Sequence, residues 1–576
     1  MKARQRPTIN LAITGTGGAG VMTAGEILLN AAAACGRYGL MSRSSGPQIR
    51  GGEAAAFVRI ANAPVGAPGD RIDVLAALDW LNIERFASEL TLDGDSLVLH
   101  EQASAAVPEF VRASGARLVP IAWEAIVRGI AGGRANLVIV GLAGALAGLT
   151  QDGLVAATLA RFAGAESDAI SAYEAAVRAG YAAGAAIEAP IVLPVVSSGA
   201  GMRWRITGNQ AVGLGALRAG VRFVAAYPIT PATEILEWLA PRIESLGGAL
   251  VQAEDELASI NMAMGASFAG IPALTATAGP GLSLMCEGIG LAVASETPVV
   301  VVDVMRGGPS TGIPAKSEQS DLGIALHGMH GDAPHVVAAP LSIADCVQTS
   351  AWVVSLAERL QTPAILLSDQ ALGQSLAIID PPNENQHIAA RELADDGTTS
   401  YRRYALTASG VSPMAVPGMA GGEYVAEGLE HSEGGRPSSD SRDHSAQLDK
   451  RQRKLDTHDY GPLWAHIEGQ GDLAILTWGS STGAAQEARA RLGDEGVETR
   501  LIALRLLMPA RVEALQQALD GVRRLLVVEQ SHSRQFFQYL RAHYELPAQR
   551  RCLHRPGPLP IRAREIVAAV QQWGSP

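Results

Sequence analysis

The chain has 576 residues, of which 48% are hydrophobic and 18% charged, and its formal net charge at pH 7 is −11. A chain of this length predicts roughly three to four domains, each with enough apolar residues for an ordinary core. The negative charge and the lack of a long lysine or arginine block argue against a nucleic-acid partner. The basic run Lys450 to Lys454 lies in a polar stretch and is interpreted as solvated surface.

The chain offers few residues for metal binding. His327 and His330 have no credible further ligands, so no metal site is predicted. The cysteines are far apart and form no C-x-x-C pair, which predicts neither a disulfide framework nor an iron–sulfur site. The cysteines are Cys35, Cys286, Cys346 and Cys552. No apolar run predicts a membrane span or a signal peptide, so we expect a cytoplasmic protein.

The first predicted block covers residues 1–188 and alternates strand-like and alanine-rich helical stretches, as in an α/β sheet with crossover helices. A strand at 9–14 leads into the glycine turn Gly15 to Gly20 and then a helix. Such a turn can hold a phosphate at a helix N-terminus. No acidic residue follows at 35–40 to bind a ribose hydroxyl, so a plain tight turn, or a contact to coenzyme A or a neighbouring subunit, is favoured over a dinucleotide site.

A second glycine turn places Arg50 directly before two glycines. A guanidinium can bind a carboxylate or phosphate through two hydrogen bonds. A solvated surface arginine is the plain alternative at this position.

After a linker at 189–204, the second block at 205–375 contains strands that are apolar almost throughout, as in strands buried on both faces. The expected strands are 222–226, 249–252, 272–277, 298–304, 335–338 and 363–368. Ligands bind at the carboxyl ends of parallel strands in open α/β sheets. The first strand leads to the motif YPITP at 227–231, which is therefore expected at a binding edge.

Three acidic residues, Glu254, Asp255 and Glu256, begin the helix after the second of these strands. Thiamine diphosphate needs a carboxylate at N1′ of its aminopyrimidine, because this hydrogen bond favours the imino form that takes the C2 proton. Glu256 opens a helix of small residues against which a ring can lie. The alternative is that all three carboxylates only complement the helix dipole.

Two more loops follow strands of the second block. Residues 275–281 place Gly279 and Gly281 at a helix start, and Arg306 begins a loop rich in glycine, proline and serine at 306–314. Either loop alone can be a plain turn. Three such loops at one sheet edge indicate a binding site.

A polar, glycine-rich stretch at 376–465 precedes the third block, and a loop of this length is either disordered or functional. The third block, 466–576, reads as a smaller doubly wound domain with strands at 473–477, 499–503 and 523–529. The chain is therefore predicted to be an α/β protein with three doubly wound parallel-sheet domains.

In this order, the motifs resemble the fused gamma–alpha subunit of 2-oxoacid:acceptor (ferredoxin) oxidoreductases, of the 2-oxoglutarate type. The resemblance covers nearly the whole chain, and YPITP together with GPSTG is highly specific. Other motifs that carry it are QAEDELASINMAMGAS at 252–267 and RGGPSTGIPAKSEQSDL at 306–322. It implies a gamma domain, a thiamine pyrimidine-binding domain, a stretch at 376–465 that covers the active site, and a transketolase C-terminal-like domain.

The resemblance also implies roles for single residues. Glu256 is the catalytic aminopyrimidine glutamate, and Thr230 and Arg306 bind the 1-carboxylate of the substrate. Arg50 meets the distal carboxylate of 2-oxoglutarate, although SSGPQIRGG differs from related segments in its glycine and proline placement, which leaves substrate choice open. The implied cofactor-binding set is Tyr227, Pro228, Ile229, Glu256, Gly279 and Gly281.

The implied reaction is the oxidative decarboxylation of 2-oxoglutarate to succinyl-CoA, with thiamine diphosphate as cofactor and coenzyme A as co-substrate. A beta subunit, in an (alpha-beta)2 assembly, is expected to supply the diphosphate site, Mg²⁺ and an iron–sulfur cluster, and to pass electrons to ferredoxin or a flavoprotein. The alternatives are pyruvate or another 2-oxoacid as substrate, an NAD(P)-binding Rossmann-type dehydrogenase, or a non-catalytic assembly subunit.

Overall fold

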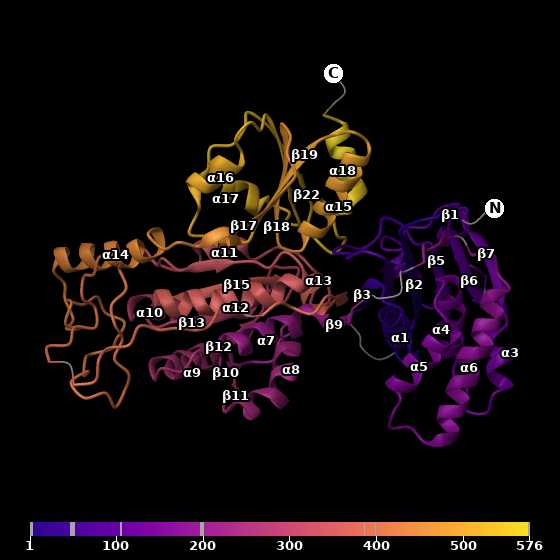
Figure 1. The fold of residues 1–576 in the computed structure, drawn as a ribbon, viewed down its shortest axis with the longest axis horizontal. Helices are drawn as coiled ribbons and strands as arrows, with labels where there is room; N and C mark the ends of the chain where they lie inside the picture. Colours follow the sequence, from indigo (N-terminus) through magenta and orange to yellow (C-terminus); the bar gives the residue numbers. More distant parts are fainter. Residues whose placement is uncertain are drawn as a thin grey trace. The chain divides into compact units, whose positions relative to one another are not determined.

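The computed structural model describes residues 4–46, 52–103, 106–189, 191–195, 201–384, 386–397 and 399–573. The described residues form two compact units (Figure 1). The first comprises the chain up to Thr207 together with Gln374–Pro381 and Arg562–Arg564, and the second comprises the remainder. The α/β class is confirmed, with three large sheets among the described residues.

In the part of the chain described, the first unit is built on an eight-stranded sheet of order β7-β6-β5-β2-β4-β3-β16-β9. The strands from β7 to β2 pair in parallel, whereas those from β2 to β9 pair antiparallel. The expected parallel sheet is therefore a mixed one, since a short connection such as that from β3 to β4 allows only antiparallel pairing. The strands are β2 (Thr8–Thr16), β3 (Tyr38–Ser45), β4 (Glu53–Ala61), β5 (Val74–Ala77), β6 (Leu97–Glu101), β7 (Arg117–Ile121), β9 (Trp204–Thr207) and β16 (Leu376–Ile379).

Helices cover this sheet with an alanine- and leucine-rich core. The principal ones are α1 (Val21–Ala34), α4 (Ala135–Leu146), α5 (Gln151–Arg161) and α6 (Ser167–Ala185). Helices α4 and α6 approach so closely that a Cβ at Gly141 would lie 2.2 Å from the backbone oxygen of Val177. Shorter elements are β1 (Arg4–Gln5), β8 (Ile191–Val192), η1 (Ile83–Phe86), α2 (Glu109–Ala113) and α3 (Trp123–Arg128).

The second unit contains a sheet of order β11-β10-β12-β13-β15-β14-β20, in which every pair but the last is parallel. Strands β12, β13 and β15 are buried along their whole length, as their continuous apolar runs predict. The strands are β10 (Phe223–Ala226), β11 (Ala249–Gln252), β12 (Ala273–Thr277), β13 (Val299–Met305), β14 (Val336–Ala338), β15 (Pro363–Asp369) and β20 (Leu506–Met508). The helices are α7 (Gly208–Ala219), α8 (Thr233–Ile243), η2 (Glu244–Leu246), α9 (Glu256–Phe268), α10 (Gly279–Ala294), α11 (Leu322–His327), α12 (Ile343–Leu360) and α13 (Gln370–Gln374).

The C-terminal block forms a further sheet of order β17-β19-β18-β21-β22 in the same unit. Its strand β20 leaves the block and pairs antiparallel with β14, so the second and third predicted blocks share a sheet. This shared pairing explains why the two blocks form one compact unit. The elements are η3 (Gly461–Trp464), β17 (Ala465–Glu468), β18 (Leu473–Trp478), α15 (Ser481–Asp494), β19 (Thr499–Leu504), α16 (Val512–Ala518), β21 (Arg524–Glu529), α17 (Gln535–His543), β22 (Gln549–His554) and α18 (Ala563–Gln571). No helix among the described residues is long and apolar enough to cross a bilayer.

The polar stretch at 376–465 is not a free linker. It begins with β16 in the first sheet, and its later part contains the helix α14 (Ser441–Asp456). Two lysines of α14, Lys450 and Lys454, are buried and bind the carboxylate of Glu296 at 2.5 and 3.0 Å. The interpretation of this basic run as solvated surface is wrong at Lys450, Arg451 and Lys454, which are all buried. Residues three and four apart lie on one helix face, and that face is packed inward.

Candidate active site

The predicted motifs of the second block gather at one edge of its sheet. Strands β10, β11, β12 and β13 are parallel neighbours, so their carboxyl ends meet. Tyr227 follows β10, Glu256 opens the helix after β11, Gly279 opens the helix after β12, and Arg306 follows β13. This arrangement places all the predicted site residues of this block at the edge where α/β proteins bind ligands.

The three acidic residues at the start of α9 occupy different environments. Asp255 is the N-cap, and its side chain accepts a hydrogen bond of 2.7 Å from the amide of Ala258. Glu254 is exposed, whereas Glu256 is only 6% exposed. Within the described residues the Glu256 carboxylate makes no hydrogen bond or ion pair. The capping reading therefore fits Asp255, and Glu256 is left as a buried carboxylate in need of a donor.

The first turn of α10 packs directly on this carboxylate. A Cβ at Gly281 would lie 2.6 Å from Oε1 of Glu256 and 2.0 Å from Oγ1 of Thr277. A side chain at residue 281 would therefore displace the carboxylate or the helix. The first turn of α10, at the N-terminus of the helix, thus lies against the acid.

Arg306 contacts Thr230, but it binds the backbone of the threonine and not its hydroxyl. Nη1 of Arg306 donates a hydrogen bond of 2.6 Å to the backbone oxygen of Thr230, and the Thr230 residue is exposed. Arg306 itself is buried, and its Nε has no acceptor in the part of the chain described. Burial lowers the pKa of Arg306, while nearby Asp321 raises it. A buried guanidinium with an unused donor can bind an anion strongly.

The other predicted cofactor-binding residues are more accessible. Tyr227 is 40% exposed, and Pro228 and Ile229 are half-buried. Large apolar side chains are also exposed on the two helices that carry the motifs, namely Leu257 and Met262 on α9 and Leu284 on α10. Exposed apolar side chains of this kind mark surfaces where a ligand or a partner binds.

Arg50 lies outside the described residues. The other glycine turn of the first unit, Gly15 to Gly20, is described and is already filled. The amide and hydroxyl of Thr16 both donate to Oδ2 of Asp79, at 2.9 and 3.2 Å, and the Gly17 amide donates to Gly52. The carboxylate of Asp79 thus ties down the strand end of this turn, which favours the tight-turn interpretation over a dinucleotide site.

The sequence reasoning did not single out two acidic residues at this edge, Asp303 and Asp321. Asp303 is fully buried in β13, and a Cβ at Gly279 would lie 2.7 Å from both carboxylate oxygens of Asp321. The available signal was the acid itself, since Asp303 interrupts a run of valines in a strand that is otherwise apolar.

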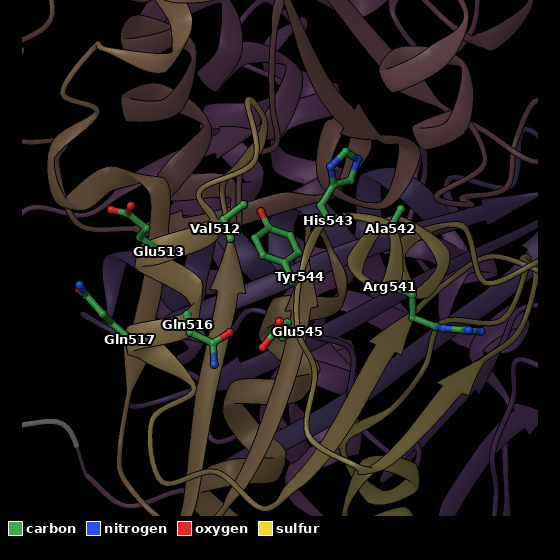
Figure 2. A pocket seen from close by; sticks show the side chains of 9 residues that line it. All are labelled: Val512, Glu513, Gln516, Gln517, Arg541, Ala542, His543, Tyr544 and Glu545. Atoms are coloured by element: carbon green, nitrogen blue, oxygen red, sulfur yellow. The ribbon is translucent and has the colours of Figure 1, made fainter.

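A separate cavity of about 680 Å³ lies in the C-terminal block. Figure 2 shows Tyr544 amid the lining residues, with the charged side chains of Glu513 and Arg541 extending outward on opposite sides. No predicted site residue lines it, so we do not assign it to the active site. Among the described residues no three His, Cys, Asp or Glu side chains converge as a metal site, and the cysteines are free.

Comparison with known proteins identifies the class. The family profile "Pyruvate flavodoxin/ferredoxin oxidoreductase, thiamine diP-bdg" matches residues 214–450, and the profile "Pyruvate ferredoxin/flavodoxin oxidoreductase" matches residues 10–183. The 2-oxoacid:ferredoxin oxidoreductase subunit alpha of Sulfolobus sp. is 30% identical, over 90% of this chain and 89% of that protein. The 2-oxoglutarate synthase subunit KorA of Archaeoglobus fulgidus is 36% identical, over 54% of this chain and 83% of that protein.

A solved structure extends the match to the fold. The 2-oxoglutarate:ferredoxin oxidoreductase from Magnetococcus marinus is 32% identical, with a TM-score of 0.91 over 99% of this chain and 100% of that one. Fold and site define an α/β oxidoreductase chain with a thiamine diphosphate-binding domain. The chain belongs to the 2-oxoacid:ferredoxin oxidoreductase family, with gamma-type and alpha-type segments fused in one polypeptide.

Proposed function

We propose that this chain is the alpha subunit of an enzyme that decarboxylates 2-oxoglutarate oxidatively to succinyl-CoA and passes the electrons to ferredoxin or a similar acceptor. The observation that carries the proposal is the Glu256 carboxylate, which is buried, unpartnered among the described residues and enclosed by the first turn of α10. The choice of substrate is supported by relatives described as 2-oxoglutarate synthase subunits, and by a structural relative with 2-oxoglutarate, coenzyme A and succinyl-CoA bound.

The residues at the sheet edge fit the aminopyrimidine of thiamine diphosphate. Glu256 would hold its N1′, because the carboxylate has no donor of its own and needs one when buried. Gly281 leaves the space that this carboxylate occupies. When bound, thiamine diphosphate supplies the carbon nucleophile and the electron sink for decarboxylation.

Arg306 is suited to hold the 1-carboxylate of the substrate. Its contact with Thr230 fixes the guanidinium, and its unused Nε can still donate. The exposed hydroxyl of Thr230 can add a further hydrogen bond. A clamp on the carboxylate orients the 2-carbonyl, and a buried clamp excludes water from the group that leaves as CO₂.

Arg50 is proposed to bind the distal carboxylate of 2-oxoglutarate. This assignment rests on its place before two glycines and on the similarity to 2-oxoglutarate enzymes. Pyruvate, which has no distal carboxylate, is the alternative substrate, and the two differ in the charge that they bring to this position.

A beta subunit is proposed to complete the site. It would supply the diphosphate site with Mg²⁺ and an iron–sulfur cluster, in an (alpha-beta)2 assembly. The exposed side chains of Tyr227, Leu257 and Leu284 provide apolar surface beside the site that such a subunit would cover. An NAD(P)-dependent dehydrogenase is less favoured, because Asp79 fills the only glycine turn on which that alternative rested.

The test is to co-express the chain with its beta partner and to measure reduction of a low-potential dye that depends on both 2-oxoacid and coenzyme A. We expect faster reduction with 2-oxoglutarate than with pyruvate, and thiamine and iron in the complex but not in the isolated chain. Equal rates on both substrates would remove the assignment to 2-oxoglutarate. A complex that binds thiamine but reduces no dye with any 2-oxoacid would support an assembly role.

A further inference from the structure

Asp303 is a buried acid without a donor. It lies in β13 and is fully buried, and neither carboxylate oxygen has a hydrogen-bond donor among the described residues. Asp369 on the neighbouring strand β15 is equally buried, but its carboxylate accepts hydrogen bonds from the Leu372 amide and from the Ser480 hydroxyl. An ionised carboxylate without such donors is far too costly to bury.

The carboxyl group of Asp321 offers the missing partner. It lies within hydrogen-bonding reach of Asp303, its Oδ1 accepts a bond of 3.0 Å from the Ser320 hydroxyl, and its Oδ2 has no donor within the described residues. Two ionised carboxylates contain only acceptors and cannot bond to each other. One proton between them supplies the donor that both groups lack and removes one buried charge.

The pair lies against the proposed active site. Asp321 packs on Gly279 and Glu256 packs on Gly281, so both acids meet the same first turn of α10. The charged groups that act on Asp321 are Glu318 and Arg306. On either side of Asp303 in the sheet are the uncharged residues Thr277 of β12 and Leu367 of β15.

We propose that Asp303 and Asp321 share one proton. The shared hydrogen bond holds Asp321 in place, and the pair sets the negative charge that faces Arg306 where the 2-oxoacid carboxylate binds. The proposal rests on the function proposed above. With one shared proton, the pair carries a single negative charge toward Arg306. Loss of the proton would add a second negative charge, which would compete with the substrate carboxylate for the guanidinium. Uptake of a second proton would leave the guanidinium unopposed.

This charge balance predicts how substrate binding depends on pH. Burial raises the pKa of Asp321 to about 6, and burial together with Asp321 raises the pKa of Asp303 well above its usual range. Below this pH the pair becomes neutral and anion binding strengthens. We therefore expect KM for the 2-oxoacid to be roughly 3- to 10-fold lower near pH 5.5 than near pH 7.5, the effect of one partly screened charge.

The shared proton can be detected without any enzyme turnover. In infrared spectra of the full chain at neutral pH, exchange from H₂O to D₂O should shift the carbonyl band of a protonated carboxyl group. The difference between wild type and Asp303→Asn should contain this band, and the difference between wild type and Glu254→Gln, which alters an exposed carboxylate, should not. Its absence from the Asp303 difference would overturn the proposal. If Asp303→Asn does not fold, the wild-type band must be present at neutral pH and grow below about pH 6, and a chain without it refutes the pair.

The role toward the substrate is tested in the complex with the beta partner. Asp321→Asn removes the charge opposite Arg306, so KM should become low and lose its dependence on pH, with kcat changed less. Asp303→Ala removes the donor that holds Asp321 in place, so KM should rise about tenfold. The amide of Asp303→Asn can donate to Asp321, so this variant should keep KM within about threefold of wild type. An unchanged KM–pH profile in Asp321→Asn would refute the role.

The outcomes separate this inference from the proposed function. A protonated-carboxyl band in a complex without 2-oxoacid activity supports the shared proton and rejects its role toward a 2-oxoacid. Full activity without the band rejects the pair and leaves the proposed function intact.

Discussion

Two glycine turns in this molecule share the pattern of strand, turn and helix, yet different side chains pack against them. At Gly15 to Gly20 the carboxylate of Asp79 accepts hydrogen bonds from the turn. At Gly279 to Gly281 the carboxylate of Glu256 packs on the turn but has no donor within the described residues. The glycines have different causes: Gly18 and Gly20 have a positive φ, whereas a Cβ at Gly279 or Gly281 would collide with neighbouring side chains. What distinguishes a filled turn from a site is the neighbouring acid, which the motif does not reveal.

The largest effect is expected from Glu256→Gln. It tests the turn at Gly279 to Gly281, called the open turn because the acid packed on it has no donor. The amide can still bond to N1′ but cannot serve as an acid or base, so kcat should fall by roughly 100- to 10,000-fold in the complex. Steady-state dye reduction measures the loss, and melting temperature checks that the fold persists. Glu254→Gln, an exposed acid two residues earlier, is the matched control and should change kcat less than about twofold. Equal losses of kcat in both variants would mean that Glu256 only complements the helix dipole.

Arg306→Ala extends the comparison to the loop beside the open turn. Loss of a charge-assisted contact should cost about 2–3 kcal/mol, or roughly 30- to 150-fold in kcat/KM, for every 2-oxoacid alike. Arg50→Ala should instead raise KM for 2-oxoglutarate and barely affect a short apolar 2-oxoacid. A pair of substrates and these two variants suffice for the measurement. If Arg50→Ala harms both substrates equally, Arg50 positions the loop or binds coenzyme A.

Gly281→Ala tests whether activity depends on the close contact between the open turn and Glu256. The added methyl would lie 2.6 Å from Oε1 of Glu256, so the carboxylate or the helix must move. We expect roughly a tenfold loss of kcat/KM, in line with about 1–3 kcal/mol for overpacking. Gly265→Ala in α9 is the control, since nothing lies within 4 Å of its added Cβ. A Gly281 variant as active as this control would show that the contact is not required.

The smallest effect is expected at the filled turn. Asp79→Ala should lower the free energy of unfolding of the first unit by about 1–2 kcal/mol, because the Thr16 amide loses its acceptor. Urea denaturation measures this change. NADH titration should detect no saturable binding to either wild type or variant. Saturable binding to the wild type would contradict the conclusion that Asp79 fills this turn.

The parts of the fold that depend on local patterns could be predicted from the sequence. The valine-rich runs gave the buried strands of the second unit, and the positions of Glu256 and Arg306 followed from where those strands end. The pairing of β16 with β3, and of β20 with β14, joins segments more than 150 residues apart, and no local pattern encodes it.

The burial of Lys450 failed prediction for a similar reason. Its helix reads as polar throughout, and its partner Glu296 is 154 residues away in the sequence. The Asp303 pair was missed because an acid in a valine strand shows its environment only when the strand has been placed beside Asp321.

The ion cluster at the far end of α10 has a consequence for how the protein can be divided. Lys450 and Lys454 hold the pKa of Glu296 well below its usual range, despite complete burial. A fragment that ended at residue 375 would leave this carboxylate buried without either cation, at a cost of about 3–5 kcal/mol for a broken buried pair. The thiamine-binding block is therefore not an autonomous module. Its stability depends on a helix that the chain reaches only after it has contributed β16 to the first unit.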